Sequence, residues 1–217
     1  MTLRDELRPL PSITGTAPPF EVHAAPADPT ELFITWLREA IGSGVVEPHA
    51  ATLSTVDAAG APDARVLVLK DVTADGGFEI ASGDESSKSR QLDGNAACAL
   101  SFHWVPLARA VRIRGTAHRA SAEDSARDFA ARHPRAKAIA LTGRQSSVMA
   151  PDDDPERSIS EALHEVERTP GLVSPQWSVW RIVPTSIEFW QGSPDRNHTR
   201  LRYERTSGAW SAARLWA

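Results

Sequence analysis

The sequence predicts a mostly β domain with flanking helices, in which the strands form an antiparallel, barrel-like sheet. From about residue 50 onward, segments that alternate in polarity or are rich in β-branched residues follow one another, separated by turn signals such as Asp75-Gly76-Gly77. The connections between these segments leave little room for the crossovers that parallel strands need. A chain of 217 residues is long enough to bury the core of such a domain without disulfide bonds.

The N-terminal part of the sequence differs from the rest. Its first 27 residues are rich in proline and lack periodicity, so we expect a flexible N-terminal arm, followed by a single domain over residues 28–217. Asp28-Pro29 is typical of a helix start. Apolar residues at helical spacing follow it, and Gly42 and Gly44 end the predicted helix.

The remaining elements follow from periodicity, turn residues and caps. Strands are expected at residues 50–57, 64–72, 77–82, 97–104, 109–120, 177–184, 186–192, 200–206 and 209–215. Helices are expected within residues 86–94, 121–133, 134–141 and 151–169. Strands occur on both sides of the longest helical part, so the pattern indicates no domain boundary there.

Composition excludes several classes of protein. The formal net charge of −4 provides no global attraction to nucleic acid or to an anionic membrane, and we expect neither as a partner. No apolar run approaches the roughly 18 residues of a membrane helix, and the first residues lack the apolar centre of a signal peptide. Cys98 is the only cysteine and cannot form an internal disulfide. These features together predict a cytoplasmic protein.

Two segments combine cations with features suited to anion binding. Arg65 and Lys70 stand at the ends of an apolar strand, where a period of two would point them to opposite faces. They could hold two different anions or be solvated strand ends. Residues 86–90 place hydroxyls and cations at a helix start, where free backbone N–H groups could bind a phosphate or the hydroxyls could simply cap the helix.

Three further polar segments are candidates. Gln145-Ser146 offers uncharged donors and acceptors suited to a flavin ring edge, although a polar loop would look the same. Arg196 and His198 lie in a basic turn, where the imidazole could transfer a proton or the whole turn could be solvated. The acidic run Asp152–Asp154 precedes Pro155 and is typical of a helix start, so no metal site is expected.

Taken in order, several segments resemble the pyridoxine/pyridoxamine 5′-phosphate oxidase family of FMN-binding split β-barrels, which includes the phenazine-biosynthesis flavin oxidases. The resemblance runs from about residue 30 to the C-terminus. Its most specific part is the end of the chain, IEFWQG…DRNHTRLRY…W…RL. The segments RVLVLK, SSKSRQL, WVPLARAVRIRG and ARHPRAKAIALTGRQSS resemble other motifs of the family.

The resemblance implies a role for each matching position in a homodimer that binds FMN. The implied FMN contacts are Arg65, Val66, Leu67, Val68, Lys70, Ser82, Ser87, Lys88, Gln145, Ser146, Trp177 and Arg200. Of these, Gln145 and Ser146 would come from the other subunit. The substrate would be bound by Lys70, Arg132, Arg196 and His198. Arg196 and His198 would lie over the flavin as the catalytic pair.

The implied reaction is the oxidation of pyridoxamine or pyridoxine 5′-phosphate, with hydride transfer to flavin N5 and reoxidation by O₂ to give H₂O₂. Four positions depart from the family pattern. Ser87 replaces an arginine, Ala110 a glutamine, Asp128 a phosphate-binding tyrosine and Ala136 a serine. Asp128 and Ala136 favour an alternative, a phenazine-type oxidase of a reduced aromatic substrate such as a dihydrophenazine. The losses at Ser87 and Ala110 favour a third hypothesis, a flavin-binding module without turnover.

Overall fold

The computed structural model describes residues 1–217, which form two compact units. The first unit contains residues 1–52, 99–114 and 184–217, and the second contains residues 53–98 and 115–183. The helices are α1 (Leu3–Leu7), α2 (Pro29–Gly42), α3 (Ser87–Gly94), α4 (Ala122–Ala131), α5 (Pro134–Leu141) and α6 (Pro155–Arg168), with short 3₁₀ turns at Val22–Ala24 and Val105–Leu107. None of the helices is both long enough and apolar enough to span a bilayer.

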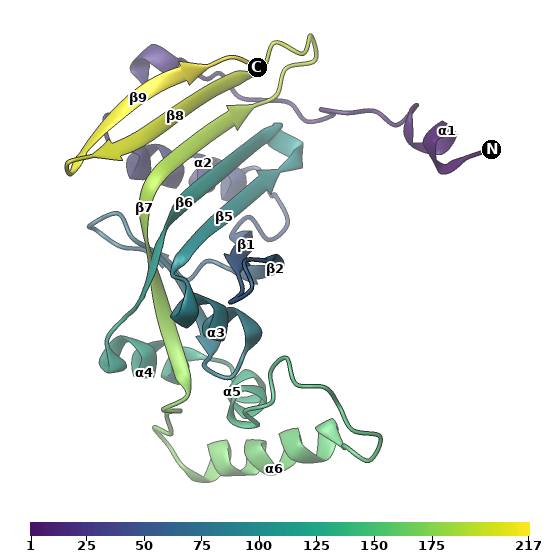
Figure 1. Ribbon diagram of the computed structural model, residues 1–217, viewed down its shortest axis with the longest axis vertical. Helices are drawn as coiled ribbons and strands as arrows, with labels where there is room; N and C mark the ends of the chain where they lie inside the picture. Colours follow the sequence, from purple (N-terminus) through teal and green to yellow (C-terminus); the bar gives the residue numbers. More distant parts are fainter. The chain divides into compact units, whose positions relative to one another are not determined.

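The strands form one nine-stranded sheet (Figure 1). Seven of them follow the order β2-β1-β5-β6-β7-β4-β3, while β8 pairs with β7 and β9 pairs with β8. The strands are β1 (Ala50–Val56), β2 (Pro62–Val68), β3 (Asp71–Val72), β4 (Phe78–Gly83), β5 (Ala97–Trp104), β6 (Arg109–Arg119), β7 (Trp177–Gln191), β8 (Thr199–Thr206) and β9 (Ala209–Leu215). The pairs β3–β4, β4–β7, β7–β8 and β8–β9 are all antiparallel. The predicted mostly β class with an antiparallel sheet and flanking helices is confirmed.

Strand β7 corrects the prediction of two separate strands at residues 177–184 and 186–192. It is one strand of 15 residues with Pro184 inside it. Its pairing with β4 ends at Ile182, and its pairing with β8 begins at Ser186. Proline has no N–H group to donate to a neighbour, so it is tolerated at this point, where β7 changes partner.

The predicted strand at residues 64–72 is likewise two strands. The first, β2, neighbours β1, whereas β3 pairs with β4. The chain changes partner at Leu69 and Lys70, and the Lys70 N–H group donates to the Glu79 carbonyl over 2.7 Å. The alternation of side chains along β2 therefore does not continue to Lys70.

The core of the first unit is mainly aromatic. Helix α2 begins as predicted, with the Asp28 carboxylate accepting from the Thr30 N–H group over 2.8 Å. Phe33 packs edge-on against Phe102 with 5.0 Å between ring centroids, and Trp36 packs against Phe189 at 5.2 Å. The apolar face predicted for this helix is thus its buried face.

Several residues of the N-terminal segment contact this core. Phe20 packs edge-on against Trp36 with ring centroids 5.0 Å apart. The Thr16 N–H group donates to the Pro106 carbonyl over 3.0 Å, and the Tyr203 hydroxyl donates to the Pro26 carbonyl over 2.8 Å. A flexible arm over residues 1–27 stays a prediction.

The second unit has its own core, built where β4, β7 and the helices α3 and α4 bury their apolar side chains. Its fully buried members include Leu53, Phe78, Ile80, Leu92, Phe129, Trp180 and Ile182. Ser121 caps α4 by accepting from the Asp124 N–H group over 3.0 Å, as the spacing of the two residues predicts. Helix α6 packs against α5 and buries none of its own residues.

Candidate functional site

A groove of about 600 Å³ in the second unit gathers most of the residues predicted to bind the cofactor. It lies along β2, at the start of α3 and beside the loop after α5. Its lining consists of Asp63, Ala64, Arg65, Val66, Leu67, Val68, Lys70, Ala81, Ser87, Lys88, Arg132, Gln145 and Ser146. Arg65 and Lys70 therefore line one groove rather than opposite faces of one strand, because the strand is interrupted between them.

Helix α3 begins at the groove. The Ser86 side chain caps it by accepting from the Ser89 N–H group over 3.3 Å. Ser82 is 2% exposed and its hydroxyl lies 2.8 Å from the Ser86 hydroxyl, so Ser82 supports the cap and is not part of the groove lining. The N-terminal N–H groups of the helix favour an anion near Ser87 and Lys88.

The groove is electropositive. The Arg65 guanidinium donates to the Thr55 hydroxyl over 2.5 Å, to Gln91 Oε1 over 2.9 Å and to the Asp63 carboxylate over 2.5 Å. Burial lowers the pKa of Lys88 below its ordinary value, the charge of Arg65 lowers it further, and Glu85 partly opposes both. A half-buried ammonium beside a guanidinium is stabilised by a bound anion, so these residues could hold a phosphate group.

Gln145 and Ser146 lie beside the start of α3 of their own chain. The resemblance implies that they contact the flavin of the other subunit, and this stays a prediction. In the structure they line the same groove as Arg65 and Lys70 of their own chain. The Ser87 N–H group donates to the Ser146 hydroxyl over 3.4 Å, because the short helix α5 ends at Leu141 and returns the chain to the start of α3.

Asp128, Trp177 and Arg132 form a cluster around Lys70. One Asp128 oxygen lies 3.5 Å from Lys70 Nζ, and the other accepts from Trp177 Nε1 over 2.7 Å. The Arg132 guanidinium stacks over the Trp177 ring at 3.9 Å. Burial lowers the pKa of Arg132, and the charge of Asp128 partly offsets this.

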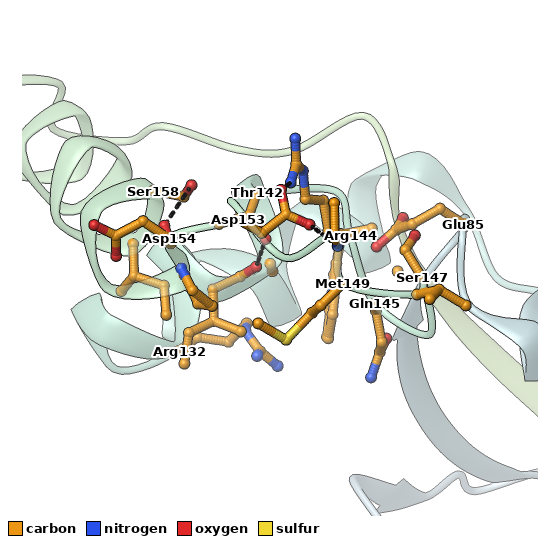
Figure 2. A pocket seen from close by; sticks show the side chains of 18 residues that line it. Glu85, Arg132, Thr142, Arg144, Gln145, Ser147, Met149, Asp153, Asp154 and Ser158 are labelled. Carbon is orange, nitrogen blue, oxygen red and sulfur yellow. Dashed lines mark hydrogen bonds and ion pairs between the residues drawn. The ribbon is translucent and has the colours of Figure 1, made fainter.

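A second cavity, of about 730 Å³, adjoins this cluster (Figure 2). Arg132 and Gln145 line both it and the groove, whereas Trp177 lines the second cavity and not the groove. Its other walls come from the end of α5, the loop before α6 and the start of α6, with Met149 among the lining side chains. Asp154 caps α6 by accepting from the Arg157 N–H group over 3.0 Å.

Arg200 lines a separate pocket of about 310 Å³ in the first unit, together with Ala110, Arg112, Glu188 and Trp190. Trp190, which the sequence analysis did not select, lines this pocket, and the flavin contact predicted for Trp177 stays a prediction. Trp190 is the direct partner of Arg200 in the β7–β8 register. Trp190 belongs to the IEFWQG segment, so the sequence alone could have indicated this residue. Its pairing with Arg200 depends on both strands.

Glu188 holds the arginines of this pocket. Its carboxylate accepts from Arg200 Nε over 2.9 Å, from Arg200 Nη2 over 2.7 Å and from Arg112 Nη2 over 2.6 Å. The Glu188 side chain is only 9% exposed. The carboxylate therefore fixes the Arg200 guanidinium beside Trp190.

The turn with Arg196 and His198 belongs to the first unit and is internally bonded. The Ser193 N–H group donates to His198 Nδ1 over 3.1 Å, and the His198 ring lies 5.0 Å from the Trp190 ring. Arg196 has a positive φ of 70° in this turn. Because Nδ1 accepts a hydrogen bond, the ring proton of neutral His198 is on Nε2.

We expect Glu188→Gln to lower the free energy of unfolding in urea by about 1.5–3 kcal/mol, because hydrogen bonds to charged partners are lost from a buried position. Glu204→Gln is the matched control, since Glu204 is 54% exposed and contacts only Arg202 at 3.3 Å. The control should change stability by no more than about 0.5 kcal/mol. Equal stability of the two variants would show that the Glu188 bonds add nothing to the fold.

Two family models match most of the chain. Residues 37–169 match the model described as pyridoxamine 5′-phosphate oxidase. Residues 177–217 match the model described as the pyridoxine 5′-phosphate oxidase C-terminal dimerisation region. The second match supports a homodimer.

Comparisons with individual proteins indicate the same family. Proteins named pyridoxine/pyridoxamine 5′-phosphate oxidase from Burkholderia lata and Microcystis aeruginosa are 40% and 38% identical, each over 87% of this chain and 88% of the relative. The structure of PhzG from Burkholderia lata in complex with tetrahydrophenazine-1-carboxylic acid superimposes with a TM-score of 0.87 at 25% identity, over 94% of this chain and all of that one.

A pyridoxamine 5′-phosphate oxidase-related, FMN-binding protein from Nostoc punctiforme shares the fold, with a TM-score of 0.69 at 17% identity over 89% of this chain and all of that one. The sheet is therefore the split barrel that the motifs predict. With family models over both parts of the chain and relatives at about 40% identity along nearly all of it, this protein belongs to the pyridoxamine 5′-phosphate oxidase family.

Proposed function

We propose that this protein is an FMN-dependent oxidase that acts as a homodimer on a small planar anionic substrate. The observation that carries the proposal is the electropositive groove along β2 and the start of α3, where Arg65 and the half-buried Lys88 stand near the N-terminal turn of that helix. Membership of a family of oxidases supports the same conclusion.

The residues of the groove fit FMN in a defined way. Lys88, Arg65 and the N–H groups at the start of α3 would hold its phosphate, with Ser87 and Ser146 as further donors. Val66, Leu67 and Val68 would lie along its apolar parts, and Gln145 offers an amide to a polar edge. Ser87 cannot supply the charge of the arginine it replaces, so Lys88 carries more of the phosphate binding.

When bound, FMN would take a hydride from the substrate and pass two electrons to O₂, which gives H₂O₂. The chain's own groups would bind and orient the substrate. Lys70 and Arg132 are the cations available to its anionic group, while His198 can donate from Nε2 because its Nδ1 is occupied. We assign Arg196 and His198 as the groups that contact the reacting part of the substrate.

Two substrates have separate support. Pyridoxamine or pyridoxine 5′-phosphate is the first candidate, because the relatives at 38–40% identity carry that enzyme name. A reduced phenazine carboxylic acid is the second, because the PhzG structure holds tetrahydrophenazine-1-carboxylic acid and Asp128 here places a negative charge beside Lys70. A flavin-binding module without turnover is the hypothesis from another class.

The test uses the purified full-length protein. We expect it to be yellow, to release FMN on heating as identified by mass spectrometry, and to produce H₂O₂ with one of the two substrate classes. Each of pyridoxamine 5′-phosphate, pyridoxine 5′-phosphate and a dihydrophenazine carboxylate is supplied in turn. A colourless protein that takes up no added FMN would contradict the proposal, and a yellow protein inactive with all three would favour the binding module.

A further inference from the structure

The cluster at Lys70 is not a simple cation site. Two cations, Lys70 and Arg132, line this part of the groove, and a carboxylate, Asp128, lies 3.5 Å from one of them. The Lys70 and Asp128 side chains are 29% and 18% exposed, so the pair is largely shielded from water. Shielding strengthens the effect of each charge on a bound ligand.

A hydrogen bond from Trp177 holds the Asp128 carboxylate in place. Trp177 Nε1 donates to it over 2.7 Å, and an indole N–H group can only donate, so it favours a carboxylate acceptor here. Trp177 is 8% exposed and packs edge-on against Phe129 at 6.2 Å between centroids. The carboxylate therefore cannot move away easily when an anion approaches Lys70.

Because Lys70 is paired with Asp128, Arg132 is the cation of the cluster that remains available to a ligand. Its guanidinium stacks on Trp177 at 3.9 Å, and its Nη2 donates to the Ala136 carbonyl over 3.1 Å. Its Nε atom is buried and has no hydrogen-bond partner. Lys70, Arg132 and Asp128 sum to one positive charge. The remaining groove cations are Arg65 on β2 and Lys88 at the start of α3, which are proposed to hold the FMN phosphate.

We infer that Asp128 is a specificity-determining residue that makes this end of the groove select a planar substrate with one carboxylate over one with a phosphate. A carboxylate carries one negative charge and balances the single positive charge of the cluster. A phosphate monoester carries about two negative charges at pH 7 and meets the Asp128 carboxylate as a like charge. The inference rests on the proposed function and narrows its substrate class to a planar aromatic monocarboxylic acid.

The test measures binding of two matched probes to the yellow holoenzyme by isothermal titration calorimetry at pH 7.5. The probes are 1-naphthoate and 1-naphthyl phosphate, which share a planar ring system, differ in charge and are not oxidised. We expect the wild type to bind 1-naphthoate at least about ten-fold more tightly. In Asp128→Asn, which keeps an acceptor for Trp177 Nε1, 1-naphthyl phosphate should bind about ten- to a hundred-fold more tightly than it binds the wild type.

The gain in affinity that Asp128→Asn produces should increase with the charge of the probe. Coulomb energy is proportional to the charge of the ligand, so 1-naphthoate should gain about half as much as 1-naphthyl phosphate on a logarithmic scale. Asp124→Asn is the matched control. Asp124 lies one turn earlier on α4 and pairs with Arg127 at 2.8 Å, so its replacement should change neither probe by more than about two-fold.

Three results would overturn the inference: a wild type that prefers 1-naphthyl phosphate, a preference that Asp128→Asn leaves unchanged, or a yellow wild type that binds neither probe. Flavin absorbance is recorded for every sample before titration. A colourless wild type refutes the proposed function itself, whereas a yellow protein with an unchanged preference refutes only the role of Asp128.

Discussion

Lys88→Met is expected to yield a protein that purifies without flavin, with its dissociation constant for FMN raised about a hundred-fold or more. Lys88 is the groove cation that makes no ion pair or hydrogen bond within the chain, and burial together with Arg65 lowers its pKa. Its charge is therefore available to a phosphate. Loss of a charge-assisted hydrogen bond costs about 1.5–3 kcal/mol, and loss of the charge itself adds to this.

Flavin absorbance of the purified protein and a fluorescence titration with added FMN measure the effect. Lys137→Met is the matched control, because Lys137 lies on α5 and lines neither the groove nor the second cavity. The apoprotein of Lys88→Met should be at least as stable as wild-type apoprotein, because the variant removes an unpartnered, half-buried charge. Normal FMN affinity in this variant would remove Lys88 from the site.

The second large effect is expected for His198→Ala, which should lower kcat by about a hundred-fold or more while FMN stays bound. The His198 ring is held by the Ser193 N–H group at Nδ1 and lies beside Trp190, so it presents an ordered Nε2–H donor. Alanine removes that donor, and the turn is then held by the hydrogen bonds that the Asp195 carboxylate accepts.

Steady-state H₂O₂ production with the substrate found for the wild type measures this loss. His164→Ala is the control, since the His164 side chain is 71% exposed on α6 and contacts only Glu167 at 3.7 Å. It should keep wild-type turnover. Unchanged turnover in His198→Ala would show that His198 does not contact the reacting part of the substrate.

Much of the fold could be predicted because its signals are local. The Asp28 cap of α2 and the Ser121 cap of α4 depend on residues within three positions of one another. The two errors in the strands, at Leu69-Lys70 and at Pro184, share one cause. In each case the chain continues in an extended form but changes its pairing partner. The periodicity of one strand does not show which strands it pairs with.

The candidate site was predicted residue by residue from ordered motifs, and most of the predicted cofactor contacts do line one groove. Contacts between residues distant along the chain could not be predicted in this way. The contact between the Ser87 N–H group and the Ser146 hydroxyl joins α3 to the loop after α5, and no local pattern indicates it. Likewise, the pairing of Trp190 with Arg200 follows from the β7–β8 register and not from the sequence of either strand alone.

By itself the sequence determined the antiparallel class, the caps, the family motifs and the residue types available for anion binding, because each depends on short-range pattern. Only the tertiary structure decided which charges meet. Lys70 and Asp128 are distant along the chain, yet their side chains lie 3.5 Å apart, with Trp177 from a third element donating to the same carboxylate. Whether a cation is free or already paired depends on such contacts, since an ion pair requires proximity in space and not in sequence.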